Sequence, residues 1–296
     1  MIKEDKGMVS TEIMIILIIL ILILGVIANF TDKTSEKIAT NIEIQNLEKL
    51  TVEVCDNLIN NPGEPKTWEK LDSTYNIVPG LSILNSDNKT IANSISYDKL
   101  LKLKDSYESL VDKKLFKNQI KSSMALYPLN SSIPPILLGS PDSGKNIVSV
   151  NRIVKCDFYL KYIIKDFKGE INCNQNHGDN FTCSYFKLYR SYLKNTDYYL
   201  LVDENNVNNN LYWTIDNTMT NNNSYTLIKD NKIYLNNILN DKLDKSYDSI
   251  FFIHFKKKKE DIKVVLVGVP KDLDKNCLNY DYFTQTNCRF ILKAWY

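Results

Sequence analysis

The sequence predicts an α+β protein in which one long N-terminal helix packs on a largely antiparallel β head domain. An apolar run near the N-terminus continues into an amphipathic stretch, which is the pattern of a single long helix. Beyond it, short runs that alternate polar and apolar residues are separated by Asn, Asp and Gly, as in antiparallel sheets. With 296 residues the chain is long enough to bury a core.

The charge balance limits the class of partner. The chain carries 37 basic and 35 acidic residues, so its formal net charge is only +2. A domain that binds nucleic acid through its phosphates usually has a clear excess of Lys and Arg. We therefore expect no nucleic-acid partner.

The first expected element is a helix over residues 8–61, with a transmembrane segment over residues 8–28. Residues 13–28 carry no charge, but they rise only about 24 Å as a helix, short of a hydrocarbon core of about 30 Å. Counting from Met8 brings the length to about 31 Å. The helix therefore spans a membrane only if it begins directly after Gly7, which puts Glu12 at the membrane edge or inside it. A carboxylate there costs about 2.5–3.5 kcal/mol unless it is paired.

The second half of this helix is expected to be amphipathic and to pack on the head. Apolar residues recur at helical spacing at Ile44, Leu47, Leu50, Val54 and Leu58, with the charged residues largely off that stripe. The sequence Asn-Asn-Pro-Gly-Glu-Pro ending at residue 65 then stops the helix. A stalk that packs on nothing is the alternative, and it would need no such stripe.

The position of Gly7 distinguishes this N-terminus from an ordinary secretory signal, in which small residues follow the apolar run and direct cleavage there. Here the glycine comes before the run. Cleavage after Gly7 would keep the apolar helix on the mature protein and would create a new α-amino group at Met8, four residues before Glu12. A plain signal-anchor helix is the alternative.

Lys6-Gly7, then Met8-Val9-Ser10-Thr11-Glu12 and the apolar run, resembles the class III signal of archaeal type IV pilin-like proteins. Ser10 and Glu12 fit the family's pattern, and Met8 stands where the family usually has glutamine. The resemblance implies that residues 1–7 are a leader, which a prepilin peptidase removes after Gly7. It also implies that other pilin-like subunits are partners, and that Glu12 pairs with the α-amino group of a neighbouring subunit.

The head is expected in two parts. Residues 62–145 form a mixed part, with Trp68 as a core anchor, a helix from about Ser96 to Lys117 and a Pro-rich loop over residues 127–144. Residues 146–296 form a β-rich part, in which residues 251–269 suggest a hairpin whose tip is the Lys-rich segment 256–261.

The cysteines are expected to form disulfides in an exported chain, since their number is even and none lies in the apolar run. Proximity in sequence favours Cys173 with Cys183 and Cys277 with Cys288, which leaves Cys55 for Cys156. A zinc site at Cys173, His177 and Cys183 with Cys156 is the alternative, but the short spacing of structural zinc ligands is missing. We expect no metal and no cofactor.

Enzymatic motifs are not found: the sequence has no Gly-rich phosphate loop, no nucleophile elbow and no HExxH. We therefore expect a protein that is not an enzyme. The resemblance implies a structural subunit of a type IV pilus-like surface filament, minor or adhesion-related because of its length, held in the cell membrane by a single pass with an extracellular head. The alternative is a membrane-anchored extracellular binding protein that does not polymerise. It would predict an aromatic cleft near Tyr185, Tyr189 and Tyr192, although the alternate spacing of these residues favours core packing.

Overall fold

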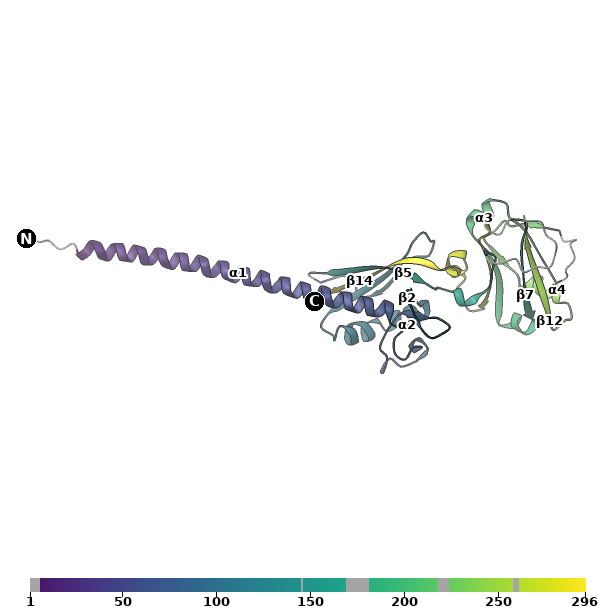
Figure 1. Ribbon diagram of the computed structural model, residues 1–296, viewed down its shortest axis with the longest axis horizontal. Coiled ribbons are helices and arrows are strands. Elements are labelled where there is room, and N and C mark those ends of the chain that lie inside the picture. The colour runs from purple at the N-terminus through teal and green to yellow at the C-terminus, as the bar shows by residue number, and fades with distance from the viewer. Residues whose placement is uncertain (1–5, 145, 169–180, 218–223, 258–260) are drawn as a thin grey trace, which may run out of the picture.

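The computed structural model describes residues 6–144, 146–168, 181–217, 224–257 and 261–296, with side chains from Glu12 onward. Its first element is α1 (Lys6–Asn60), a single helix of 55 residues and about 80 Å. Figure 1 shows α1 projecting from a head that holds all the strands. The predicted α+β class, with a long N-terminal helix packed on a largely antiparallel β domain, is confirmed.

The C-terminal part of α1 packs on the head with the predicted apolar stripe. Leu47, Val54 and Leu58 are buried, and Ile44 and Leu50 are partly buried. Thr51 and Cys55 are also buried on this face, where small side chains let the helix approach the sheet closely. The helix ends at Asn60, one residue before the predicted end, because Pro62 and Gly63 follow, and Gly63 has a positive φ of 83°.

The proximal unit of the head is a six-stranded sheet in the order β1-β2-β5-β14-β3-β4. All its pairings are antiparallel except that of β2 with β5. One face packs against α1 and the other faces solvent, so residues alternate along each strand. The strands are β1 (Ser82–Leu84), β2 (Thr90–Ile95), β3 (Lys121–Pro128), β4 (Ile136–Gly139), β5 (Val148–Cys156) and β14 (Thr286–Trp295).

Helical segments complete the proximal core. The predicted helix from Ser96 is found as α2 (Tyr97–Asp105), followed by the π-helical segment η2 (Glu108–Leu115). Leu100, Leu103 and Leu110 are buried in one cluster with the C-terminal part of α1. Trp68 lies in the short helix η1 (Trp68–Lys70); its ring is fully buried and its Nε1 donates to the carbonyl of Gly80 at 2.9 Å. The prediction of Trp68 as a core anchor is therefore confirmed.

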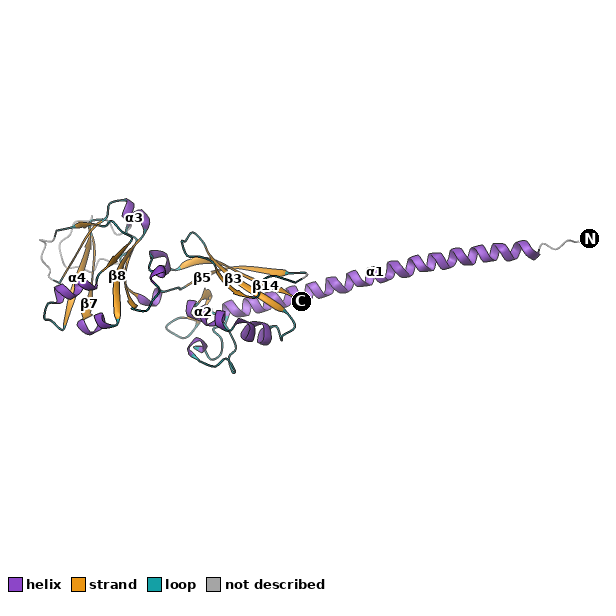
Figure 2. Ribbon diagram, turned by 180° about the vertical axis from the view of Figure 1, so that it is seen from behind, coloured by secondary structure: helices purple, strands orange, loops and turns teal. Residues whose placement is uncertain are grey.

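The distal unit is a sandwich of two four-stranded sheets, seen at the far side of the head from α1 in Figure 2. The short helices α3 (Glu204–Asn208), η4 (Arg190–Lys194) and α4 (Asn236–Leu243) join its strands. One sheet has the order β10 (Thr226–Leu227), β9 (Tyr212–Asp216), β12 (Asp248–Phe255), β7 (Thr182–Tyr189), and the other β11 (Lys232–Tyr234), β8 (Thr196–Val202), β13 (Val264–Pro270), β6 (Ile163–Asp166).

The second of these sheets joins the two units because both of its faces are buried. Along β13, Val264 and Leu266 pack into the core of the sandwich, whereas Val265, Val267 and Val269 pack into the proximal core. A strand buried on both faces is apolar throughout, which explains the unbroken run of apolar residues in β13. The short helices η3 (Leu160–Tyr162), η6 (Lys275–Cys277) and η7 (Tyr280–Phe283) lie in the loops of this region.

Two expectations for the head are corrected. The boundary expected between residues 145 and 146 does not separate the units, because β5 and β14 pair with strands of the first part. The predicted hairpin over residues 251–269 is wrong, since β12 and β13 lie in different sheets of the sandwich. In both cases the deciding interaction is pairing between distant strands, for which a single sequence gives no local signal.

Candidate assembly segment of the N-terminal helix

The N-terminal half of α1 projects away from the head (Figure 1). Every residue from Glu12 to Ala39 is exposed, a length of about 42 Å. The apolar side chains from Ile13 to Ile27 are exposed around the whole circumference, from 49% for Ile18 to 69% for Val26. Exposure of such a continuous apolar surface to water is unfavourable, so we expect lipid or other apolar helices to cover it.

This segment is long and apolar enough to cross a membrane. The helix satisfies the length and hydropathy of a span from Glu12 onward, and none of its most apolar window is buried in the protein. The first charged residues after the apolar run are Asp32 and Lys33, where the helix becomes polar. Its apolar part therefore ends well before the head begins to cover α1 near Thr40.

The predicted processing residues lie at the start of α1. Lys6, Gly7 and Met8 belong to the first turns of the helix, which begins one residue before Gly7 rather than directly after it. Their side chains lie outside the described residues. Glu12 is exposed, one helical turn from Met8.

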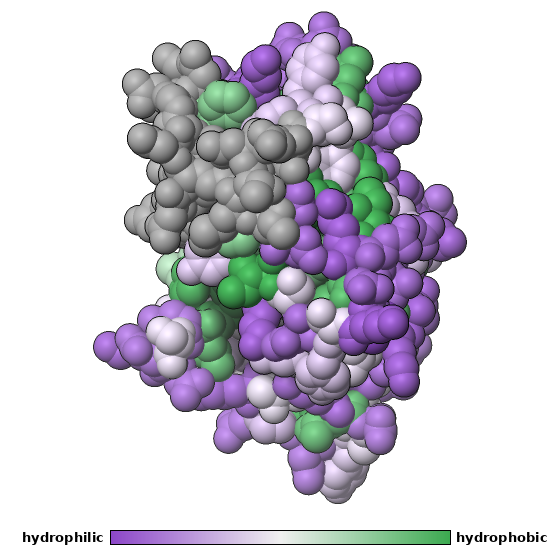
Figure 3. Space-filling view, turned by 90° about the vertical axis from the view of Figure 1, so that its right-hand side faces the viewer, coloured by the Kyte–Doolittle hydropathy of each residue, from purple (hydrophilic) through white to green (hydrophobic). Residues whose placement is uncertain are grey.

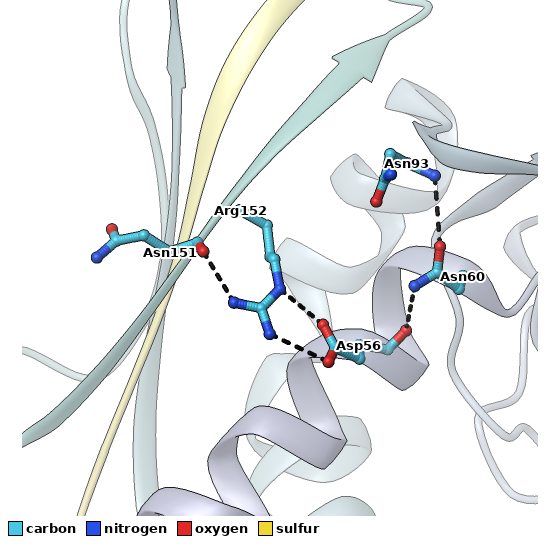
Figure 4. Close-up of polar contacts among 5 residues, drawn as sticks. All are labelled: Asp56, Asn60, Asn93, Asn151 and Arg152. Carbon is cyan, nitrogen blue, oxygen red and sulfur yellow. Dashed lines mark hydrogen bonds and ion pairs between the residues drawn. The ribbon is translucent and has the colours of Figure 1, made fainter.

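An ion pair holds the C-terminal part of α1 to the sheet (Figure 4). The guanidinium of Arg152 on β5 donates from Nε to Asp56 Oδ1 at 2.8 Å and from Nη2 to Asp56 Oδ2 at 3.1 Å. The same guanidinium donates from Nη1 to the carbonyl of Asn151 at 3.0 Å. One turn further along α1, Asn60 Oδ1 accepts from the backbone N of Asn93 at 3.3 Å. These contacts fix the direction in which α1 leaves the head.

Three of the predicted disulfide cysteines line the interface between α1 and the sheet as buried free thiols: Cys55, Cys156 and Cys288. Burial raises the pKa of Cys55 and of Cys288 to about 12, and it raises that of Cys156 as well. These thiols are therefore protonated and inert at neutral pH.

The predicted disulfides Cys55–Cys156 and Cys277–Cys288 are absent. Cys277 lies in η6 beside the rings of Tyr159 and Tyr282, whereas Cys288 Sγ contacts the carbonyl of Thr286 at 3.5 Å.

The fold instead makes Cys156 and Cys288 diagonal neighbours on β5 and β14, since Cys156 faces Thr286 and Cys288 faces Val154. Diagonal Cα atoms in a sheet are about 7–8 Å apart, which is too far for a disulfide. Cys183 is buried in β7, and its predicted partner Cys173 lies outside the described residues, as does His177. Within the described part of the chain, no three His, Cys, Asp or Glu side chains are placed to hold a metal ion.

The tyrosines considered for ligand binding lie on the distal unit. Tyr189 packs edge-on against Tyr192 at 5.5 Å and against Tyr247 at 6.0 Å between ring centroids. Tyr185 packs on Phe252 instead. Figure 3 shows the distal end of the head: hydrophilic residues cover most of its described surface, and apolar residues form smaller patches between them.

Sequence reasoning missed the Asp56–Arg152 contact, because these residues are 96 positions apart and only the fold brings them together. Asp56 lies beside the apolar stripe of α1, and nothing in the local pattern indicates a partner for its charge. No protein family, curated protein or solved structure matches the chain.

Proposed function

We propose that this chain is an archaeal type IV pilin-like subunit, minor or adhesion-related, which assembles into a surface filament through the apolar half of α1. The observation that carries the proposal is the exposure of every described apolar side chain from Ile13 to Ile27 on a helix that continues without a break into the head. In the membrane, lipid would cover this surface. In a filament, the same surfaces of neighbouring subunits would cover one another.

Glu12 supports assembly rather than simple anchoring. A lone carboxylate in this apolar segment disfavours insertion by about 2.5–3.5 kcal/mol. Cleavage after Gly7 would place an α-amino group at Met8 of each subunit, and a buried carboxylate and a buried amine each become tolerable when they pair. In this proposal Glu12 of one subunit meets the N-terminus of its neighbour and sets the axial register. The head is then extracellular, and the prepilin peptidase acts before assembly.

The substitution Glu12→Gln tests the proposal. Gln is neutral and costs less than a carboxylate in an apolar environment, so insertion into the membrane should be retained. Because the charge that pairs with the neighbouring amine is lost, incorporation into sheared surface filaments should fall below detection. Mass spectrometry of the intact wild-type chain from the same fractions should give an N-terminus at Met8.

The matched control is Glu36→Gln, which makes the same substitution at an exposed position of α1 beyond the apolar run. This variant should enter the sheared fraction like the wild type. Unchanged incorporation of the Glu12 variant would refute the register role. A chain that keeps its first residues and occurs only in membranes would favour the alternative, an anchored binding protein that does not polymerise.

A further inference from the structure

The head contains a polar cavity where its proximal and distal units meet. Its volume is about 330 Å³, and both units contribute to its walls. Residues 130–132, after β3, and residues 279–281 come from the proximal unit. The distal unit contributes residues 202–205 and Asn208, at the end of β8 and in α3, and Asn231 before β11. A ligand in this cavity would therefore touch both units at once.

Internal hydrogen bonds hold the two walls. On the proximal side, Asp281 Oδ2 accepts from the backbone N of Ser132 at 2.6 Å, from Ser132 Oγ at 2.8 Å and from Ser131 Oγ at 3.2 Å. On the distal side, Asp203 Oδ1 accepts from the backbone N of Asn205 at 3.0 Å. Walls fixed in this way lose little conformational entropy when a ligand binds.

Other polar groups of the lining make no side-chain hydrogen bond or ion pair with any described residue: the hydroxyl of Tyr280, the amides of Asn130, Asn208 and Asn231, and the carboxylate of Glu204. An amide both donates and accepts, as a hydroxyl does. Burial, and then the nearby carboxylates of Asp166, Asp203 and Asp281, raise the pKa of Tyr280, so its hydroxyl stays protonated at neutral pH. The cavity thus offers several donors and acceptors that the fold itself does not use.

The charge of the lining limits the class of ligand. The carboxylates of Asp203, Glu204 and Asp281 line the cavity, and no Lys or Arg is among its described lining residues, so phosphate and other anions are disfavoured. Apolar ligands are disfavoured too, since Val202 is the one aliphatic residue among the described lining. No three metal-binding side chains converge within the described part of the chain.

We propose that this cavity binds a neutral sugar. Sugar hydroxyls each donate and accept, which matches the unused amides and the Tyr280 hydroxyl. The cavity volume of about 330 Å³ lies at the small end of the usual range for ligand sites, as expected for a single sugar unit. The inference stands independently of filament assembly, because the cavity lies wholly in the head.

The test uses the full chain in a polyoxyethylene detergent, which carries no sugar. The protein is produced in a host without N-glycosylation, because Asn130 stands in an Asn-Ser-Ser acceptor sequence. Glucose, galactose, mannose, N-acetylglucosamine and N-acetylgalactosamine are titrated separately, and binding is followed by saturation-transfer NMR. At least one should bind at millimolar concentration, and Tyr280→Phe should weaken it about 2- to 10-fold, the effect of one neutral hydrogen bond.

The double substitution Asn208→Ala and Asn231→Ala, both at exposed positions, should weaken binding further without unfolding the head. Tyr247→Phe is the matched control: Tyr247 lies next to Arg190, which bonds to Asn240 of α4 at the opposite end of the distal unit from α3 (Figure 1). This control should bind like the wild type. The proposal is overturned if none of the five sugars binds, or if the Tyr280 and Asn208/Asn231 variants bind unchanged. It is also overturned if calcium chloride alone, rather than a sugar, gives saturable binding that these variants lose.

Discussion

The buried carboxyl of Asp157 should make the head less stable at neutral pH than at mildly acidic pH. Asp157 follows β5, and its Oδ1 accepts from the backbone N of Tyr97 at 2.7 Å, at the start of α2. Burial, opposed by this hydrogen bond, raises its pKa from 3.8 to about 6. The nearby charge of Asp98 acts in the same direction as burial, whereas that of Lys161 opposes it.

The sign follows from the protons bound in each state. Well below pH 4 the carboxyl is protonated in both the folded and the unfolded chain, so its ionisation does not change the free energy of unfolding. Between pH 4 and pH 6 the folded chain holds the proton more tightly, and the free energy of unfolding falls as the pH rises. Above pH 6 the folded chain must ionise a buried group. The pKa difference of about two units corresponds to a destabilisation on the order of 3 kcal/mol at neutral pH.

Asp157→Asn removes this ionisation, and its amide oxygen can still accept from Tyr97. The variant should be more stable than the wild type at pH 7.5, and the difference in free energy of unfolding should grow by about 1–2 kcal/mol between pH 5 and pH 7.5. The assay is denaturant unfolding of the full chain in a polyoxyethylene detergent. Tryptophan fluorescence reports on the head, because Trp68, Trp213 and Trp295 are all buried there.

The matched control is Asp248→Asn, the same substitution at a half-exposed carboxylate of β12 in the distal unit, which pairs with Lys187 at 2.7 Å. Its stability relative to the wild type should change little over the same pH range, since exposed pairs contribute about 0–1 kcal/mol. A constant difference between the Asp157 variant and the wild type at all pH values would refute the reasoning. A variant that loses stability at pH 7.5 would show that the ionised carboxylate stabilises α2 more than its burial costs.

The remaining predictions concern the interface between α1 and the sheet. In a double-mutant cycle, Asp56→Asn and Arg152→Met should show a coupling of about 1 kcal/mol, because the contact is bidentate but its side chains are 43% and 34% exposed. The coupling should shrink in high salt, and a value near zero in low salt would contradict a role in fixing α1. Without reductant, iodoacetamide should modify Cys277 of the native protein faster than the buried Cys55, Cys156 and Cys288, and all four after unfolding. Resistance of any of these four after unfolding would reveal a disulfide.

Local patterns in the sequence were enough to predict α1 and the helix after Ser96, but not the short helices α3 and α4. The apolar residues from Ile44 to Leu58 recur every three or four positions, which predicts the packed face of α1. Pro62 and Gly63 do not continue a helix, so they predict where α1 ends. The same holds for the helix after Ser96, whose apolar face is buried as expected. Interactions between residues close in sequence determine the faces and ends of these helices, so local sequence patterns are enough to predict them.

The sheets could not be predicted in the same way. β14 pairs with β3 and β5, although more than 120 residues separate it from both, by the registers Ala125 with Ile291 and Cys156 with Thr286. Proximity in sequence therefore gave a wrong partner for Cys288, which the prediction paired with Cys277. The cavity shares this origin, because Ser131, Asn208 and Tyr280 come from three separate parts of the chain. Strand pairs and cavities that form between distant parts of the chain leave no periodic pattern in a single sequence.

The packing connects α1 to the cavity through one continuous hydrophobic core. Leu58 of α1 lies in the same core cluster as Val267 of β13, and β13 is also part of the distal sandwich. Tightly packed cores transmit a displacement instead of absorbing it. If neighbouring helices fix the free half of α1, as we propose, they also fix the orientation of the distal unit and of the cavity. The Asp56–Arg152 contact lies along this path, so its loss should loosen the head on α1 while leaving the cavity intact.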